Sequence, residues 1–177
     1  MKQLLLVLQL AFCLNLSAQT IVENTFSKAD SITTIKTSTE TLGGSFMAFS
    51  YLGASIVYYN IPKSTESSQS FVGCFLTFKT TDIHTLNDSS FVMITFSNGT
   101  KKRYGYFDFS KVLGSENSSS FSFIVDRKDN LYTSCIKSIQ INTPAKKYNY
   151  VLKKSISNTI KNELLLIMQE VKKEHIL

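Results

Sequence analysis

The chain has 177 residues, of which 43% are hydrophobic and 18% charged, and its formal net charge is +6. That balance is typical of a globular protein and argues against a disordered chain. Seventeen of the 19 basic residues are lysines, and the two arginines are Arg103 and Arg127. Because proteins that read nucleic acids depend heavily on arginine, this composition argues against nucleic acid as a partner.

The first eighteen residues predict an export signal. Lys2 precedes an apolar run from Leu4 to Leu16, and the small residue Ala18 follows. A charged start, about a dozen apolar residues and a small residue at the exit are typical of a secretory signal peptide. The run is shorter than the roughly twenty apolar residues that a membrane-spanning helix needs. We therefore predict cleavage after Ala18 and an exported protein, periplasmic or extracellular, without a permanent membrane span.

Two other interpretations of this segment stay open. The apolar run would instead form a buried N-terminal core helix, although it has no amphipathic pattern. Alternatively, Cys13 would carry the acyl chain of a lipoprotein, although the bulky Phe12 stands where that processing needs a small residue. The exit sequence from Ser17 to Gln19 resembles that of exported proteins of Gram-negative bacteria, which implies the cell envelope.

Residues 19–177 predict a single β-rich domain. Thirteen Phe and eight Tyr, together with many Thr, Ser, Ile and Val residues, favour strands over helices. Regularly spaced turn signals predict an antiparallel β-sandwich of about eight or nine strands. A small barrel is the alternative, because the order of the elements resembles that of lipocalin-like proteins. The chain has no tryptophan, which such proteins usually carry near their first strand.

In chain order, residues 31–41 are prone to form strands, and residues 45–60 form a long aromatic stretch. Gly53-Ala54 in its middle predicts a bulge or a tight connection between two strands. Residues 62–70 are polar and rich in serine, which predicts a loop. Residues 71–80 predict a strand because apolar side chains alternate along it. Its apolar face carries Val72, Cys74, Leu76 and Phe78.

The strongest local signal for a turn is Asn98-Gly99, which lies between two β-prone runs. This pair predicts a hairpin with a two-residue type I′ turn. Pairing outward from such a turn sets Phe96 opposite Lys101. The face that we expect to enter the core then carries Phe91, Met93, Tyr104 and Tyr106.

Further strands are predicted at residues 121–125, 135–141 and 148–152, with a charged turn at residues 126–130. From about residue 155 to residue 175 the apolar side chains recur every three or four positions instead. This period predicts a C-terminal amphipathic helix. Its apolar face carries Ile156, Ile160, Leu164, Ile167 and Val171.

Cys74 and Cys135 are the two cysteines that remain after signal cleavage. In an oxidising compartment an even pair favours a disulfide, which would stabilise the fold by about 4 kcal/mol. The alternative is two separate buried thiols, since free cysteine is a good small core residue. Both interpretations stay open at this point.

The sequence predicts no catalytic, metal or cofactor site. His84 and His175 are isolated, and Asp126-x-x-Asp129-Asn130 lacks the glycine and the repeated oxygen ligands of a calcium loop. Neither glycine–serine pair completes the Gly-x-Ser-x-Gly motif of a nucleophile elbow. The acidic residues are scattered, so no pair of glycosidase carboxylates stands out.

Tyrosines are the only candidates for ligand contacts. Exposed aromatic side chains on a sheet stack on sugars or anchor interfaces, whereas the alternative is that they complete the core. Our leading hypothesis is a non-enzymatic binding or structural module of the cell envelope, whose partner is a glycan, a lipid or a protein. A small-ligand carrier with a barrel cavity and an unrecognised hydrolase are the alternatives. The candidate contact residues are Tyr58, Tyr59, Tyr104 and Tyr106.

Overall fold

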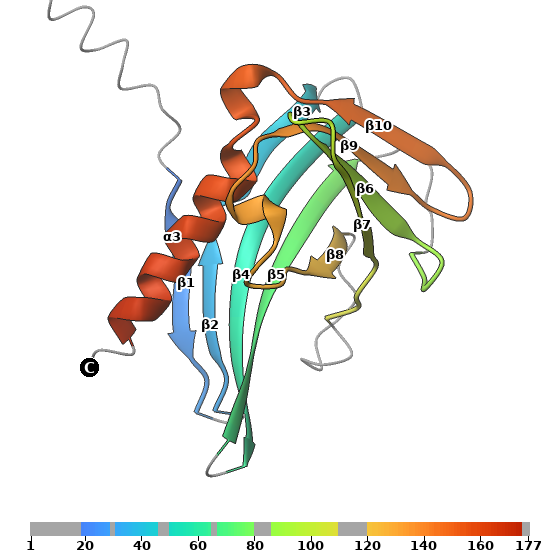
Figure 1. Cartoon of the computed structure of the whole chain (residues 1–177). Helices are drawn as coiled ribbons and strands as arrows, with labels where there is room; N and C mark the ends of the chain where they lie inside the picture. The colour runs from blue at the N-terminus through green and yellow to red at the C-terminus, as the bar shows by residue number, and fades with distance from the viewer. Residues whose placement is uncertain are drawn as a thin grey trace, which may run out of the picture.

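The protein is mainly β, with two antiparallel sheets and one C-terminal α-helix (Figure 1). This confirms the predicted fold class, and the described strands form no closed barrel. The computed structural model describes residues 19–28, 31–45, 50–64, 67–79, 86–109 and 120–174. The predicted signal peptide, His84 and His175 lie outside these ranges. No helix within them is long and apolar enough to cross a membrane.

The larger sheet, sheet A, runs in the order β1-β2-β4-β5-β8, and β3 pairs with β4 beside β2. Sheet B runs in the order β10-β9-β6-β7. The bounds in sheet A are β1 (Ile21–Phe26), β2 (Thr33–Thr37), β3 (Glu40–Ser45), β4 (Ser50–Ser64), β5 (Ser67–Lys79) and β8 (Ser120–Ile124). Those in sheet B are β6 (Phe91–Phe96), β7 (Lys101–Gly105), β9 (Ile136–Asn142) and β10 (Lys147–Val151). The helical segments are η1 (Asn130–Tyr132), η2 (Lys154–Ile156) and α3 (Thr159–Glu174).

The long hairpin of β4 and β5 is the centre of sheet A. Val72, Cys74 and Leu76 are buried on one face of β5, which confirms the predicted alternation. The tight connection predicted at Gly53-Ala54 is wrong, because β4 runs through these residues and pairs with β3 on one side and β5 on the other. The bulge, which was the other interpretation, occurs in this pair of strands, but the extra residue lies in β3, between Thr41 and Gly43, opposite Gly53 and Leu52.

The serine-rich loop predicted at residues 62–70 is also replaced by strand. Ile61 pairs with Gln69 and Pro62 with Ser68, so the hairpin continues well beyond the core (Figure 1). Serine and proline disfavour central strands but are tolerated where a hairpin protrudes into solvent. The polar composition of this end of the hairpin predicted a loop, whereas its backbone forms paired strands.

The hairpin of β6 and β7 turns through three residues rather than two. Phe96 N donates to Thr100 O at 2.9 Å, and Gly99 N donates to Phe96 O at 3.0 Å. Gly99 has a φ of +86°, the left-handed conformation that glycine adopts without steric cost. A three-residue turn that ends in a left-handed glycine is the next commonest hairpin connection after the two-residue turns.

This extra turn residue shifts the predicted register and changes which face of β6 enters the core. Thr95 pairs with Lys101, whereas the sequence predicted Phe96 in that place. Because side chains alternate along a strand, a shift of one residue exchanges the two faces. The prediction that Phe91 and Met93 enter the core is therefore wrong. The buried side chains of this hairpin are Val92, Ile94, Phe96 and Tyr104.

Helix α3 begins and ends close to the predicted bounds, and its apolar face is the predicted one. Ile160, Leu164 and Ile167 are buried against the sheet, and α3 contacts β2, β4 and η1. Figure 1 shows α3 lying across the β1–β2–β4 side of sheet A, with sheet B over the other side. Two different layers thus cover one face of sheet A.

The two sheets also approach each other at their edges. β7 lies beside β8, and β10 lies beside β3. After β7 the chain continues along β8, where Phe107 N donates to Ser122 O at 2.8 Å and the Ser122 hydroxyl donates to Phe107 O at 2.5 Å. This short junction between the sheets is where the candidate site lies.

Candidate functional site: two adjoining clefts beside a buried aspartate

The first cleft, which we call the tyrosine cleft, has a volume of about 310 Å³. It opens at the junction of β7 and β8, and its lining combines aromatic rings with charged groups. This volume lies at the lower end of the range for ligand clefts in proteins. The lining includes Lys102, Tyr104, Tyr106, Phe107, Asp126 and Asp129.

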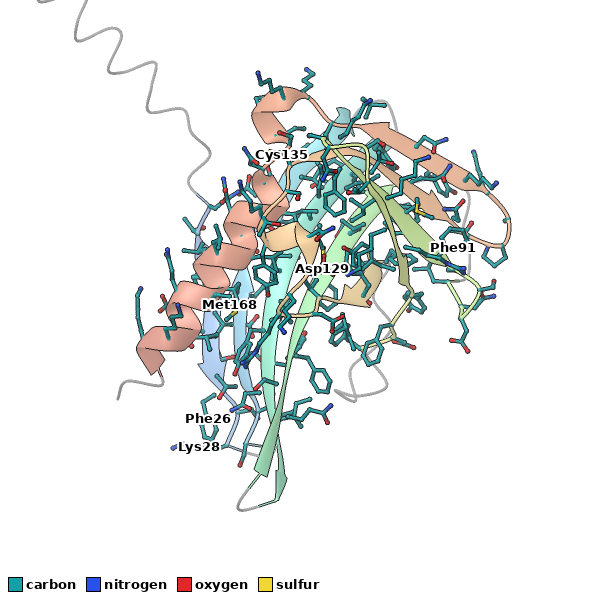
Figure 2. All side chains as sticks on the ribbon, in the orientation of Figure 1. Phe26, Lys28, Phe91, Asp129, Cys135 and Met168 are labelled. Carbon is teal, nitrogen blue, oxygen red and sulfur yellow. The ribbon has the colours of Figure 1, made fainter. Side chains whose placement is uncertain are left out.

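The second cleft, the helix cleft, has a volume of about 260 Å³. It lies between α3, the β4–β5 hairpin and the turn after β8. Met168 and Val171 of α3 contribute apolar surface, whereas Tyr58 and Arg127 contribute polar groups. Figure 2 shows the α3 residue Met168 beside sheet A. Ile124 and Asp126 line both clefts, so the two clefts adjoin along the turn after β8.

Asp129 organises the tyrosine cleft. Its side chain is almost fully buried, and Figure 2 places it in the interior of the molecule, beside η1. Oδ1 accepts hydrogen bonds from the Tyr104 hydroxyl at 2.6 Å and from Leu131 N at 3.0 Å, and Oδ2 lies 2.6 Å from Lys102 Nζ. A buried carboxylate is tolerated when it is paired and hydrogen-bonded in this way. Asp129 therefore joins the start of η1 to β7 across 25 residues of sequence.

The Tyr104 hydroxyl acts as a fixed donor. Burial and the hydrogen bond to Asp129 both raise the pKa of Tyr104 far above its ordinary value. Burial also raises the pKa of Tyr106, and the Asp108 charge adds to this effect. Both phenols are therefore neutral at physiological pH and act as hydrogen-bond donors rather than as bases, and the single O–H of Tyr104 is already donated to Asp129.

The structure distributes the four tyrosines that the sequence singled out over different places. Tyr104 and Tyr106 both line the tyrosine cleft, and Tyr58 lines the helix cleft, where its hydroxyl donates to Ser70 Oγ at 3.2 Å. Tyr59 follows Tyr58 on the strand and therefore lies on the opposite face of sheet A. There its ring packs 5.5 Å from that of Phe109, and burial raises its pKa to about 12. Three of the four thus gather at the adjoining clefts.

Cys74 and Cys135 are free thiols in this structure, so the disulfide is not formed. Cys74 is fully buried on β5, where burial raises its pKa well above the ordinary value. Cys135 lies partly exposed before β9, and its thiol donates to Asn158 Oδ1 at 2.8 Å. A buried thiol with a raised pKa is a poor nucleophile, so Cys74 acts as a core residue.

Glu163 is a buried acidic residue that sequence analysis missed. It lies on the sheet-facing side of α3, near Thr37 of β2, and its side chain is fully buried. The Thr37 hydroxyl already accepts a hydrogen bond from Ile56 N at 2.9 Å. Neither carboxyl oxygen of Glu163 has a partner in hydrogen-bond geometry among the described residues.

Burial therefore raises the pKa of Glu163 to about 9. The Glu40 charge adds to this shift, whereas the nearby Thr37 hydroxyl opposes it in part. The signal for this residue was its position, because Glu163 falls among Ile160, Leu164 and Ile167 on the apolar face of the predicted helix.

Within the described residues, no group of three or more His, Cys, Asp or Glu side chains is arranged to hold a metal ion. Comparison with known proteins adds no family or relative. No protein-family model, no curated protein and no solved structure matches the chain. Functional inference therefore rests on the geometry of the chain itself.

Replacing Asp129 with alanine should destabilise the protein strongly. The change leaves the buried Tyr104 hydroxyl and Leu131 N without an acceptor and Lys102 without its counter-charge. We expect a loss of about 3 kcal/mol in the free energy of unfolding, measured by urea denaturation. The matched control is Asp126→Ala in the same turn, where the side chain is exposed and the loss should stay within about 0.5 kcal/mol. Equal losses for the two variants would show that Asp129 has no special structural role.

Glu163→Gln should stabilise the protein at alkaline pH. Between its ordinary pKa near 4.5 and about 9, only the folded state keeps the Glu163 proton. Unfolding then releases a proton, so the free energy of unfolding falls with rising pH, by at most about 1.4 kcal/mol per unit. Below this window both states are protonated, and above it both are ionised, so the dependence ends.

We expect Glu163→Gln to remove this decline and to raise the melting temperature at pH 8, measured by circular dichroism from pH 4 to 10. Glu170→Gln on the same helix is the control, since Glu170 is partly exposed and pairs with Lys173. Its pH profile should match that of the wild type. An unchanged profile in Glu163→Gln would contradict the assignment.

Proposed function

We propose that this chain is an exported, non-enzymatic binding module of the cell envelope that holds sugar units of a glycan in the tyrosine cleft and the helix cleft. The observation that carries this proposal is that the two clefts adjoin along one turn, with Asp126 in the lining of both. Export is supported by the sequence from Lys2 to Ala18, which has the organisation of a cleaved signal.

The chemistry of the two linings favours a sugar over an apolar ligand. Sugars present both C–H faces, which pack on aromatic rings, and hydroxyl groups, which bond to carboxylates and phenols. The tyrosine cleft offers Tyr106 and Phe107 for the first role and Asp126 for the second. Arg127 and Ser70 supply further polar groups in the helix cleft. A lipid chain would instead favour an enclosed and wholly apolar lining.

The rival hypothesis of a barrel carrier receives less support. A carrier keeps its ligand between the strands, but here the space between the two sheets is occupied by fully buried side chains. Large aromatic and branched residues from both sheets meet there. They include Leu76, Ile94, Phe96, Phe121, Phe123 and Ile139.

A hydrolase is the second alternative, because two carboxylates, Asp126 and Asp129, line one cleft. Acid–base catalysis needs a carboxyl group that is available to the substrate. Both oxygens of Asp129 are already engaged by Tyr104, Lys102 and the backbone of η1. This arrangement favours a structural role for Asp129 and leaves Asp126 as a ligand contact.

Export predicts a defined mature N-terminus. Protein recovered from the envelope fraction of producing cells should begin at Gln19, as read by N-terminal sequencing. Replacing Leu8 and Leu10 with arginine interrupts the apolar run and should leave the full-length chain in the cytoplasm. Recovery of the wild-type chain from the cytosol with Met1 attached would contradict the proposal.

The cleft proposal predicts that Asp126→Asn weakens sugar binding. A glycan array probed with residues 19–177 identifies a ligand, and titration calorimetry then measures its affinity. Loss of one charge-assisted hydrogen bond should raise Kd about tenfold. The control is Asp88→Asn, an exposed aspartate in the turn before β6, which should leave Kd unchanged. Binding that is unaffected by Asp126→Asn would place the ligand elsewhere, and release of reducing ends from the bound glycan would favour the hydrolase.

A further inference from the structure

The outer face of sheet B is a regular platform of side chains whose arrangement follows from the strand register. Residues that pair across antiparallel strands share a face of the sheet. Starting from Met93 on β6, the register sets Arg103 beside it on β7, Gln140 on β9 and Asn149 beyond on β10. A row above and a row below complete the face. The upper row is Lys147, Asn142, Phe91 and Gly105, and the lower row is Val151, Ser138, Thr95 and Lys101.

This platform is positively charged and contains no opposing charge. None of the four strands β6, β7, β9 and β10 includes an aspartate or a glutamate. Lys101, Arg103 and Lys147 all lie on the outer face and are exposed. A surface with cations and no acidic residue attracts polyanions from solution, and it does so most strongly at low salt.

The middle row carries groups that recognise a polar chain rather than charge alone. Gln140 Nε2 donates to Asn149 Oδ1 at 2.8 Å, so the two amides hold each other in place. This bond uses one N–H of the Gln140 amide and the side-chain oxygen of Asn149. The side-chain oxygen and the second N–H of Gln140, and the NH₂ group of Asn149, keep their capacity to bond to a ligand. At the other end of the platform, the Arg103 guanidinium lies 4.1 Å from the centre of the Phe91 ring. Stacking on the ring fixes the orientation of the guanidinium while its N–H groups stay exposed.

We propose that the outer face of sheet B binds an acidic polysaccharide, laid across the strands from β10 to β7. The platform is about 14 Å wide, since neighbouring strands lie about 4.8 Å apart. Lys147 marks one edge, and Arg103 and Lys101 mark the other. Carboxylate or sulfate groups of the chain pair with these cations, and its hydroxyl groups bond to the amides of Gln140 and Asn149 between them.

Two other occupants suit this face less well. A second copy of the chain would bring the same cations against Lys101, Arg103 and Lys147, and like charges repel across an interface. A bilayer surface favours apolar side chains that insert between the headgroups. Among the exposed large hydrophobic residues of the described chain, only Val151, 78% exposed, lies on this platform.

The platform borders the tyrosine cleft at Arg103 and Gly105, which belong to both, but its other residues and its ligand chemistry differ from those of the clefts. It faces away from the core, whereas Tyr104 and Asp129 lie on the inner side of sheet B. Figure 2 shows Phe91 on sheet B, away from the interior position of Asp129. Lys101, Lys147, Gln140 and Asn149 line neither cleft. Variants at these four positions therefore test the platform without changing a residue that lines a cleft.

The test compares binding of residues 19–177 to polygalacturonate, which carries carboxylates, and to neutral dextran, by affinity electrophoresis and titration calorimetry. We expect binding to polygalacturonate only. The double variant Lys101→Glu/Lys147→Glu should raise Kd at least tenfold. The matched control Lys28→Glu/Lys172→Glu changes the net charge equally, at exposed positions away from sheet B, and should raise Kd less than twofold (Figure 2 marks Lys28).

Two further variants separate recognition from charge alone. Gln140→Leu removes the central amide and keeps every cation, and it should raise Kd about fivefold if the polysaccharide lies across the middle row. Asp126→Asn should leave polygalacturonate binding unchanged, because Asp126 belongs to the clefts.

The proposal is overturned by any of three results. The two double variants could lose binding equally, which would make net charge the only determinant. Dextran could bind as tightly as polygalacturonate, which would remove the role of the cations. Vesicles of phosphatidylglycerol could bind the protein while polygalacturonate does not, which would make the platform a membrane contact. Equal thermal unfolding of all variants is required before the affinities are compared.

Discussion

The structure depends on covering one face of the β4–β5 hairpin. These strands have 15 and 13 residues, whereas the strands of sheet B have five to seven, so sheet B cannot extend over the whole face. Helix α3 covers the part that sheet B leaves, with Ile160, Leu164 and Ile167 turned to the sheet. Each buried side chain of this size contributes roughly 1.5–3 kcal/mol. Both layers are therefore needed for a closed core.

Sheet B and α3 do not meet completely over sheet A, and we call the boundary between them the seam. The buried acidic side chains lie at this seam. The turn after β8 and η1 run along it, and their backbone groups need partners because they are partly shielded from water. Asp129 supplies an acceptor to Leu131 N and fixes Tyr104 and Lys102 of β7 at the same time. The clefts open along this seam because neither layer reaches fully across it.

Glu163 shows the opposite outcome under the second layer. Its carboxyl group faces the break between β2 and β3, where the Thr37 hydroxyl replaces a backbone partner for Ile56 N. Thr37 provides the hydrogen bond that Ile56 N needs, but none of the residues that the structure describes bonds to the Glu163 carboxyl, which burial keeps neutral. A neutral buried acid costs far less than a buried charge. The seam thus contains one carboxylate that is paired and one carboxyl that is protonated.

Sequence periodicity predicted the elements whose pattern is local. The apolar face of α3 and the alternation of β5 follow from the residues of each segment alone, and both are confirmed. The face of β6 was wrong because it depends on whether the Asn98-Gly99 turn contains two residues or three, and one residue decides every pairing beyond it. The role of Asp129 could not be predicted for another reason, since Asp129 precedes η1 whereas its partner Tyr104 lies on β7, 25 residues away in the sequence. The platform on sheet B needs that same register, so the sequence alone could not assemble it.

The lysines of sheet B have a simpler explanation than ligand binding, and the binding proposal must account for features that this explanation leaves out. β7 and β10 are the edge strands of this sheet, and charged side chains on edge strands prevent pairing with other chains. Edge protection accounts for Lys101 and Lys147, but a glutamate would protect an edge equally well. It accounts neither for the absence of acidic residues from all four strands nor for the amide pair on Gln140 and Asn149. Charge reversal at the two edges separates these roles, because it preserves protection against aggregation while it removes the attraction for a polyanion.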